Sequence, residues 1–204
     1  MAKIGGQNGI RSFIGIFPPP EIQSAVEKVQ SLLKVDGANV KWEPKEKFHV
    51  TMKFLGSVFP QNIKQIQKLL TDNLESLLPF EIALTSVGCF PSPNNPRVFW
   101  IGSSALDENV SLKTCFELIE KACIESGCEK EVRPFHPHIT LGRTKGRQPA
   151  TSASGNVSPR LINILESATF EPMTFRCRQV SVMRSILHPS GSSYSTQCTI
   201  PLKQ

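Results

Sequence analysis

The chain has 204 residues and a mass of 22.6 kDa, with 39% hydrophobic and 20% charged residues. This composition excludes a disordered or fibrous chain and predicts one large domain or two small lobes that share a core. The formal charge of +6 favours a phosphate-bearing partner, although a positive charge can also serve solubility alone. The sequence has no run of about 18 apolar residues and no signal-peptide pattern, so we expect a cytoplasmic protein without membrane contact.

The six cysteines show no C-x-x-C pair. They predict reduced, mostly packed thiols, because a chain of this length is stable without cross-links. A zinc site formed by Cys115, Cys123 and Cys128 is the alternative, but it would need a ligand spacing that is irregular for structural zinc motifs.

Strands and helices alternate in the first half of the chain. Apolar residues at three- and four-residue spacing predict amphipathic helices over residues 21–35 and 60–78, each with a proline near its start. Extended apolar stretches predict strands over 11–17 and 48–55. A turn over 38–43 precedes the second strand, which Gly56 ends.

The second half is richer in strands. A turn over 91–96 joins two of them as a hairpin, and a helix over 107–126 ends at Gly127, which suits a left-handed C-cap. Residues 144–160 are small and polar, and they predict a long mobile loop before a short helix over 161–168. The expected strands cover 80–90, 97–101, a stretch beginning at Pro137, 173–187 and 192–202.

Two tetrapeptides share one pattern: His-Val-Thr-Met at 49–52 and His-Ile-Thr-Leu at 138–141. In an extended strand alternate side chains share a face, so each histidine lies beside its threonine and the aliphatic residues cover the other face. If the two strands meet across a cleft, two imidazoles and two hydroxyls converge, which suits acid–base chemistry on a phosphodiester. The competing interpretation is that His49 and His138 are half-buried strand histidines bonded to backbone.

The strand–helix–strand theme occurs in each half together with one motif, which indicates an internal duplication. We therefore predict an α+β fold of two pseudo-symmetric lobes, each an antiparallel sheet with outer helices, around a central groove. The expected organisation is a flexible N-terminus, 1–10, followed by a single bilobal domain, 11–204.

Several stretches together carry a family resemblance. They are RSFI at 11–14, KW at 41–42 leading to HVTMKFLG at 49–56, RVFWIG at 97–102, FHPHITLGR at 135–143, and RS at 184–185 through Tyr194. From about residue 11 to residue 202 the chain resembles the bacterial-type RNA 2′,3′-cyclic phosphodiesterases, also called 2′-5′ RNA ligase-like proteins. These belong to the 2H phosphoesterase superfamily, which is named for two His-x-Thr/Ser motifs.

The resemblance implies hydrolysis of the 2′,3′-cyclic phosphate at an RNA 3′ end to a 2′-phosphate, with no metal or other cofactor. It implies that His49 is the proton donor, that His138 is the proton acceptor, and that Thr51 and Thr140 bind phosphate oxygens. The residues alone leave the acid and the base unassigned, because two imidazoles with pKa values near 6.5 predict only a bell-shaped rate profile around neutrality.

Two further residues are candidates for substrate binding. Arg143 follows the second motif where the family often carries arginine, but strand alternation places it opposite His138, so it needs a twist or a bulge to reach the groove; a surface ion pair is the alternative. Tyr194 ends the family pattern S-x-L-x-x-x-G-x-x-Y, and a structural hydrogen bond is its alternative. Lys53 shares the parity of His49, so it either lines the groove floor or is a solvated strand-end lysine.

The other histidines and the aromatic residues complete the candidate list. His136 forms a His-Pro-His pair with His138 that resembles a metal-binding arm, but no third ligand is evident, and His188 is expected at the surface. The residues expected in the core are Phe13, Phe48, Phe54 and Trp100. The aromatic residues expected near strand ends, where a base could stack, are Trp42, Phe90 and Tyr194. Two basic loop residues, Lys145 and Arg147, are expected to contact RNA phosphates beyond the terminal one.

The rival to an enzyme is a catalytically idle nucleotide- or RNA-binding module that uses the same groove. Reverse 2′-5′ ligation shares the chemistry of hydrolysis and is a third possibility. The expected partners are RNA with cyclic phosphate ends, including tRNA fragments, or small cyclic nucleotides. We expect a monomer, because one chain forms the whole groove.

Overall fold

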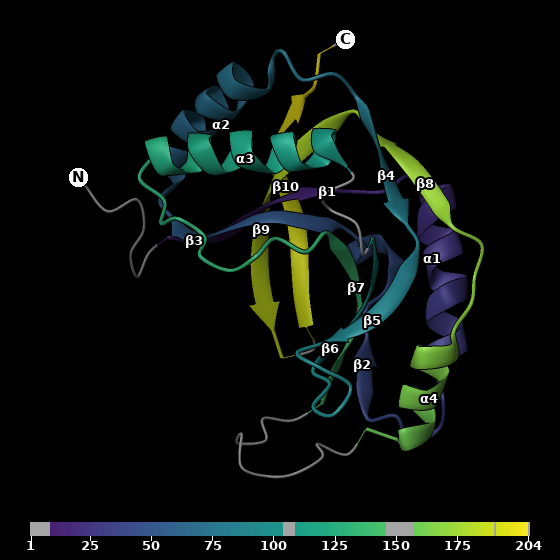
Figure 1. The fold of residues 1–204 in the computed structure, drawn as a ribbon. Coiled ribbons are helices and arrows are strands. Elements are labelled where there is room, and N and C mark those ends of the chain that lie inside the picture. The colour runs from purple at the N-terminus through teal and green to yellow at the C-terminus, as the bar shows by residue number, and fades with distance from the viewer. Residues whose placement is uncertain (1–8, 104–108, 146–156, 190, 204) are drawn as a thin grey trace.

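The computed structural model describes residues 9–103, 109–145, 157–189 and 191–203. Its elements in chain order are β1 (Ile10–Ile16), α1 (Pro20–Leu33), β2 (Val40–Trp42), the 3-10 helix η1 (Lys45–Lys47), β3 (Val50–Val58), α2 (Pro60–Leu74), β4 (Phe80–Leu84), β5 (Ser86–Phe90), β6 (Val98–Gly102), α3 (Val110–Glu125), β7 (His138–Thr144), α4 (Pro159–Ser167), β8 (Met173–Cys177), β9 (Gln179–His188) and β10 (Gly191–Pro201). Figure 1 shows their arrangement.

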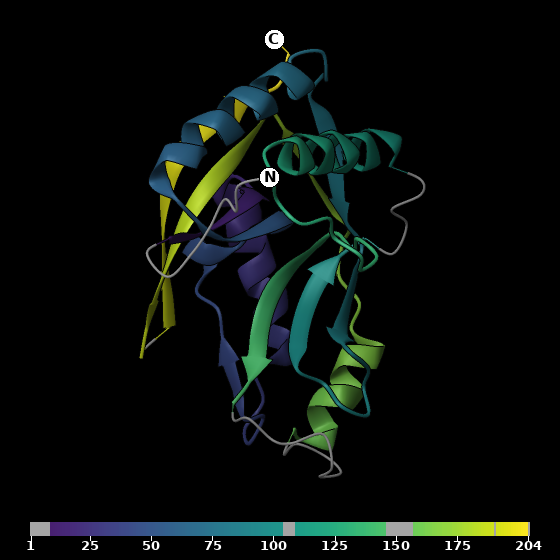
Figure 2. The same cartoon turned by 90° about the vertical axis from the view of Figure 1, so that its left-hand side faces the viewer.

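Eight of the described strands form one antiparallel sheet in the order β10-β9-β1-β3-β7-β6-β5, with β2 paired to β7. The sheet has two halves that meet between β3 and β7, where the only residue pair is Val50 with Ile139. Figure 2 shows the yellow β9–β10 hairpin on one side and the green β7 beside the teal β6 in the centre. The prediction of an α+β fold with two antiparallel lobes is confirmed.

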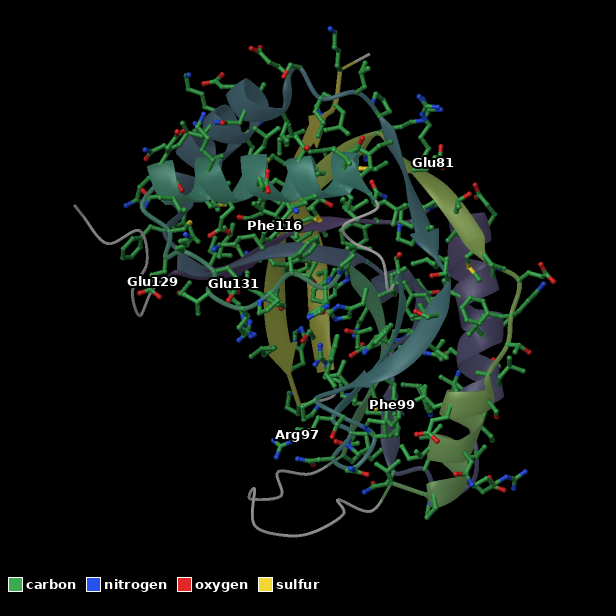
Figure 3. All side chains as sticks on the ribbon, viewed as in Figure 1. Glu81, Arg97, Phe99, Phe116, Glu129 and Glu131 are labelled. Carbon is green, nitrogen blue, oxygen red and sulfur yellow. The ribbon has the colours of Figure 1, made fainter. Side chains whose placement is uncertain are left out.

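The helices cover the two halves in pairs. α2 and α3 pack together above the half that contains β3 and β10, whereas α1 and α4 pack together beside the half that contains β5 and β7 (Figure 1). α1 follows β1 in the sequence but contacts the opposite half, so the two lobes interlock. Their cores contain fully buried residues such as Val50, Phe99 and Ile139, and Phe99 is labelled in Figure 3.

Local sequence signals explain where the helices begin and end. α1 and α2 each begin at a proline, which lacks the N–H that a first helical turn leaves unpaired. The Asn109 side chain accepts a hydrogen bond from the Leu112 amide at 3.0 Å and caps α3. Gly127 follows α3 with φ +92°, which confirms the predicted glycine C-cap.

The structure corrects two predicted strands. The stretches 80–90 and 173–187 are each divided, into β4 and β5 and into β8 and β9, and the first member of each pair forms a separate two-stranded sheet. The divisions fall at Thr85, whose amide donates to the Gly102 carbonyl, and at Arg178. An apolar run carries no information on which sheet it joins, so the sequence alone did not show the change of partner.

Three smaller differences concern element boundaries. β3 continues through Gly56, which has φ +69°, to Val58, and the expected turn at 38–43 contains the short strand β2. The expected flexible terminus and mobile loop lie largely outside the described residues, and β1 includes residue 10. No helix within the described ranges is both long and apolar enough to cross a membrane.

Candidate active site

The two motif histidines are held in the same way. The His49 ring Nδ1 lies 2.6 Å from the Lys47 carbonyl oxygen, and the His138 ring Nδ1 lies 2.6 Å from the His136 carbonyl oxygen. A carbonyl oxygen only accepts hydrogen bonds, so Nδ1 carries the proton in both rings. In the neutral imidazole the other nitrogen, Nε2, is then an acceptor that is able to take a proton.

The single pair between β3 and β7 brings the motifs together. Antiparallel pairing of Val50 with Ile139 sets His49 beside Thr140 and Thr51 beside His138 on the adjoining strands. The two aliphatic side chains are fully buried, so the four polar side chains belong to the opposite face of the sheet. The histidines therefore lie diagonally across one junction.

A β-bulge follows the threonine in each motif. Gly15 pairs with Thr51 and Ile14 with Lys53, so Met52 is the extra residue on β3. Trp100 pairs with Thr140 and Phe99 with Gly142, so Leu141 is the extra residue on β7. An extra residue reverses the alternation of faces beyond it. The two bulges occupy the same place in the duplicated motif.

The bulge on β7 settles the placement of Arg143. Arg143 lines the same cavity as His49, Thr51, Thr140 and Tyr194, although regular alternation would place it on the face opposite Thr140. The sequence argument required a twist or a bulge, and the structure contains the bulge.

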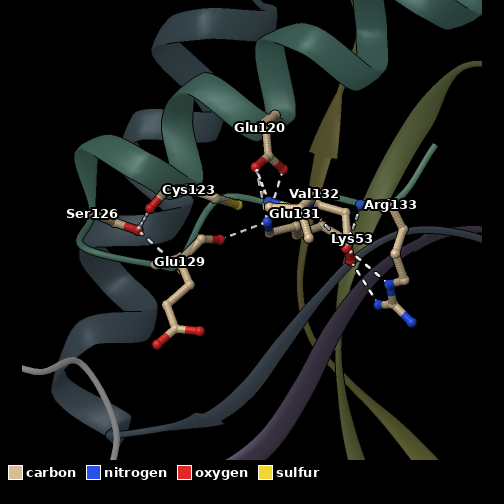
Figure 4. Close-up of polar contacts among 9 residues, drawn as sticks. Lys53, Glu120, Cys123, Ser126, Glu129, Glu131, Val132 and Arg133 are labelled. Atoms are coloured by element: carbon tan, nitrogen blue, oxygen red, sulfur yellow. Dashed lines mark hydrogen bonds and ion pairs between the residues drawn. The ribbon is translucent and has the colours of Figure 1, made fainter. Parts of the chain in front are cut away.

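The bulge on β3 makes the predictions for Lys53 and Phe54 wrong. Lys53 turns away from the groove and is 5% exposed, whereas Phe54 is 54% exposed and lines the cavity. The Lys53 ammonium forms an ion pair with Glu120 of α3 and donates a 2.8 Å hydrogen bond to the Glu129 carbonyl. Figure 4 shows this network, in which the Glu131 amide also donates to Glu120.

A buried side chain supports the bulge on β7. Gln30 of α1 is 1% exposed, and its Nε2 donates to the carbonyls of Glu43 at 2.7 Å and Leu141 at 2.8 Å. The Leu141 carbonyl also accepts from the Glu43 amide. Gln30 therefore joins α1 to the backbone that carries Thr140 and Arg143.

Gln30→Met keeps the length of the side chain but leaves the Glu43 carbonyl without a side-chain donor and removes one of two donors to Leu141. We expect the free energy of unfolding to fall by about 1–3 kcal/mol, the cost of an unsatisfied buried polar group. Urea unfolding measures the change, with the exposed Gln65→Met as the matched control. Equal stability of the two variants would show that Gln30 does not support the bulge.

The cavity has a volume of about 420 Å³, within the range of small-ligand sites. Its described lining includes four cationic side chains and one carboxylate. Its lining residues are Arg11, Ser12, Phe13, Lys41, Glu43, Lys47, His49, Thr51, Phe54, Thr140, Arg143, Ser185, Gly191, Ser192 and Tyr194. His138 is not among them, but when it is protonated it lowers the pKa of His49, as Arg143 does.

Aromatic rings surround both histidines. His49 contacts Phe13, Phe17 and Tyr194, with ring centroids 4.8, 5.3 and 5.4 Å away. His138 has Phe90 at 5.1 Å and Trp100 at 6.4 Å. The core predictions for Phe13 and Phe48 are confirmed.

The remaining aromatic predictions need correction. Trp100 is only half-buried, and its ring stacks on Phe90 with the centroids 5.3 Å apart. Trp100 pairs with Thr140, so its side chain lies on the same face of the sheet as the histidines and threonines and not in the core. Trp42, expected at a strand end where a base could stack, instead packs against Phe99 at 5.9 Å. Phe90 and Tyr194 remain beside the two histidines.

Burial lowers both imidazole pKa values. The pKa of His49 falls from 6.5 to about 4, mainly through desolvation and also through the charges of His138 and Arg143, against the bond to the Lys47 carbonyl. Desolvation likewise lowers the pKa of His138, and Arg143 and His136 act in the same direction. Both rings are therefore neutral at pH 7 in the free protein.

The other candidate residues lie away from this cavity. His136 is exposed and contributes its carbonyl to His138, while its ring faces Phe90 at 5.8 Å. His188 is exposed, as expected, and its Nε2 lies 2.9 Å from the Ser193 hydroxyl. Lys145 is exposed and does not line the cavity, and Arg147 lies outside the described residues. Across the described residues, no group of three or more His, Cys, Asp or Glu side chains is arranged to hold a metal ion.

The bulged sheet and paired His-x-Thr motifs define a two-histidine phosphoesterase architecture. A family model described as LigT like Phosphoesterase matches residues 16–100 and 106–194. The chain belongs to this family.

Curated relatives and solved structures agree with this assignment. The RNA 2′,3′-cyclic phosphodiesterase of Methanocaldococcus jannaschii is 36% identical over 91% of this chain and 96% of its own length. The protein of the same name from Methanothermobacter thermautotrophicus is 30% identical over 91% and 95%. The crystal structure of E. coli LigT complexed with 3′-AMP shares the fold, with a TM-score of 0.73 at 22% identity, over 97% of this chain and 100% of that one.

Proposed function

We propose that this protein hydrolyses the 2′,3′-cyclic phosphate at the 3′ end of RNA to a 2′-phosphate. The observation that carries the proposal is the junction at Val50 and Ile139, which sets two histidines, each with Nε2 as its acceptor nitrogen, beside two threonine hydroxyls. The cationic cavity next to it suits an RNA substrate. The names of the relatives from M. jannaschii and M. thermautotrophicus support the same reaction.

The proposed reaction is an in-line displacement at phosphorus. His138 Nε2 takes a proton from the attacking water, and the new P–O bond forms as the bond from phosphorus to the 3′ oxygen breaks. His49 donates a proton to the departing 3′ oxygen. The Thr51 and Thr140 hydroxyls and the Arg143 guanidinium stabilise the negative charge on the phosphate oxygens. Both histidines recover their protonation states by exchange with solvent.

Binding of the phosphate also favours the protonated form of His49, and the proton comes from solvent. His49 is neutral at pH 7 in the free protein because its pKa is about 4. A phosphate anion bound beside the ring favours the charged imidazolium and raises this pKa. The acid therefore forms when the substrate binds, and the reaction needs His138 in its neutral form as the base.

Turnover of 2′,3′-cyclic AMP tests the proposal directly. We expect 2′-AMP as the product, identified by phosphorus NMR. Formation of 3′-AMP would overturn the leaving-group assignment, and saturable binding without product would identify a catalytically idle binding module. Joining of tRNA halves would reveal ligation activity. The monomeric state and the cytoplasmic location stay predictions.

The pH dependence of kcat/KM is expected to peak below pH 6.5. A neutral base and a protonated acid coexist most between their two pKa values, and both pKa values lie below 6.5 in the free protein. Activity therefore declines as the pH rises through neutrality, whereas two unperturbed imidazoles would give a profile centred near neutrality. Initial rates on 2′,3′-cyclic AMP from pH 4 to 9 measure the profile, and a maximum at or above pH 7 would contradict the burial of the two rings.

A further inference from the structure

Two lysines that line the cavity converge beside Gly191. A Cβ atom placed on Gly191 would lie 3.0 Å from Lys41 Nζ and 3.7 Å from Lys47 Nζ. Gly191 has φ +139°, a conformation that side chains rarely adopt. The two ammonium groups therefore approach one point on the β9–β10 hairpin, and they come from β2 and η1, which are remote from it in sequence.

The sheet register adds a third cation. Lys41 of β2 pairs directly with Arg143 of β7. Like charges placed opposite each other on neighbouring strands are destabilising. Arg11 lines the same cavity, whereas Glu43 is the one carboxylate among its described lining residues. An arrangement of this kind is stabilised by an anion that carries more than one charge.

We propose that Lys41 and Lys47 form a second phosphate subsite, which binds the phosphodiester that precedes the terminal nucleotide of the RNA. This proposal rests on the proposed function and adds to it a preference for an oligonucleotide over a mononucleotide. In this proposal the terminal phosphate occupies the junction of the histidines and threonines. Arg143 lies between the two subsites, because it pairs with Lys41 across the strands and its charge lowers the pKa values of both histidines. The positive φ of Gly191 disfavours any side chain at this position, so the space beside the two ammonium groups stays open.

The test compares kcat/KM on an oligoribonucleotide with a 2′,3′-cyclic phosphate end and on 2′,3′-cyclic AMP. In the variant K41Q/K47Q we expect the ratio of the two values to fall about 10-fold, mainly through KM for the oligonucleotide. The slope of log KM for the oligonucleotide against log salt concentration should also decrease by about 0.7 for each lysine removed. Lys45→Gln is the matched control, because Lys45 lies on η1 but pairs with Glu27 and does not line the cavity.

An unchanged ratio in K41Q/K47Q, or an equal fall in K45Q, would overturn the second subsite. If the wild-type protein hydrolyses neither substrate, the proposed function fails, and the subsite is then tested by binding alone. A fluorescent oligoribonucleotide with a 3′-terminal phosphate should bind the wild-type protein more tightly than K41Q/K47Q, and equal binding would reject the subsite. Failure of the reaction and failure of the subsite are therefore distinguishable.

An independent observation concerns the end of α3. The Cys128 amide donates to the Cys123 carbonyl at 2.8 Å, and the Gly127 amide donates to the Ile124 carbonyl at 2.9 Å. These two bonds define a Schellman motif, in which the residue after the glycine contacts the residue three positions before the cap. Here both contacting residues are cysteines. Figure 4 shows Cys123 and Ser126 at this helix end.

The surroundings activate one thiol of the pair. Cys123 is fully buried, whereas Cys128 is half-buried. The hydrogen bond with Cys123 lowers the pKa of Cys128 and raises that of Cys123, and the Lys53 ammonium also lowers the pKa of Cys128. A thiolate is the nucleophilic form of cysteine.

The geometry points to a reversible disulfide between Cys123 and Cys128, formed with a hydroperoxide as oxidant. The Cys128 thiolate attacks the peroxide oxygen, the O–O bond breaks, and a sulfenic acid and one hydroxide, protonated to water, result. The Cys123 sulfur then attacks the sulfenic sulfur, the disulfide bond forms, and a second water leaves. Both thiols are oxidised and the peroxide is reduced.

Hydrogen peroxide treatment of the whole protein, followed by intact-mass and peptide analysis, tests the disulfide. We expect loss of two hydrogen atoms, a cross-linked peptide that contains Cys123 and Cys128, and recovery with dithiothreitol. In Cys123→Ser the sulfenic acid on Cys128 should persist and react with dimedone. The buried Cys115→Ser is the control and should cross-link as the wild type does. An unmodified Cys128, or its cross-link to any other cysteine, would overturn the assignment.

Discussion

Alanine in place of His138 is expected to lower kcat on 2′,3′-cyclic AMP by about 10²–10⁴-fold, the usual contribution of a positioned general base. The variant removes the acceptor Nε2 but leaves the His136 carbonyl and the β7 bulge in place. His49→Ala should cause a loss of similar size, because the departing 3′ oxygen then leaves without a proton.

The two losses should not add. Residues that act as a unit give a double variant little worse than either single one, so H49A/H138A should resemble H138A. His188→Ala is the matched control, since His188 is exposed and contacts Ser193 instead of the cavity. Near-native turnover by either single variant would contradict the two-histidine mechanism, and circular dichroism verifies that each variant is folded.

Replacement of Lys53 is expected to have the largest effect on stability. Its side chain is 4% exposed, and its Nζ lies 2.9 Å from Glu120 Oε1 and 2.8 Å from Oε2. Lys53→Met leaves the Glu120 carboxylate buried without its cation, which costs about 3–5 kcal/mol of unfolding free energy. Urea unfolding measures this loss.

Two comparisons distinguish a buried ion pair from a general packing defect. The variant K53M/E120L removes both charges and should recover part of the stability, because no buried charge is left unpaired. Lys68→Met breaks an exposed ion pair with Asp72 on α2 and should change stability by less than about 1 kcal/mol. A K53M/E120L variant less stable than K53M, or a K53M loss as small as that of K68M, would contradict the account.

The motifs made the polar face of the site predictable, and the bulges set the limit of that prediction. Period-two alternation placed His49 with Thr51 and His138 with Thr140 correctly, because no extra residue intervenes within either motif. Beyond the threonines the same rule failed for Lys53, since Met52 reverses the faces. A bulge depends on how a neighbouring strand pairs, which sequence periodicity does not reveal.

Partner choice also limited the fold prediction. The extents of α1 and α3 followed from apolar spacing, proline and glycine, which are local signals. The separation of β4 from β5 depends on β8, which is almost a hundred residues away in the sequence. Gln30 lies within the helix predicted over 21–35, and only the tertiary fold shows that its amide bonds to the Leu141 carbonyl.

A titration of the protein, labelled with nitrogen-15 at its histidines, with 2′-AMP tests most directly that both imidazoles approach one phosphate. The account predicts that the Nε2 resonances of His49 and His138 both shift and saturate with a single dissociation constant, while those of His188 stay unchanged. A shift of only one motif histidine, or saturation of the two at different concentrations of 2′-AMP, would contradict a shared anion.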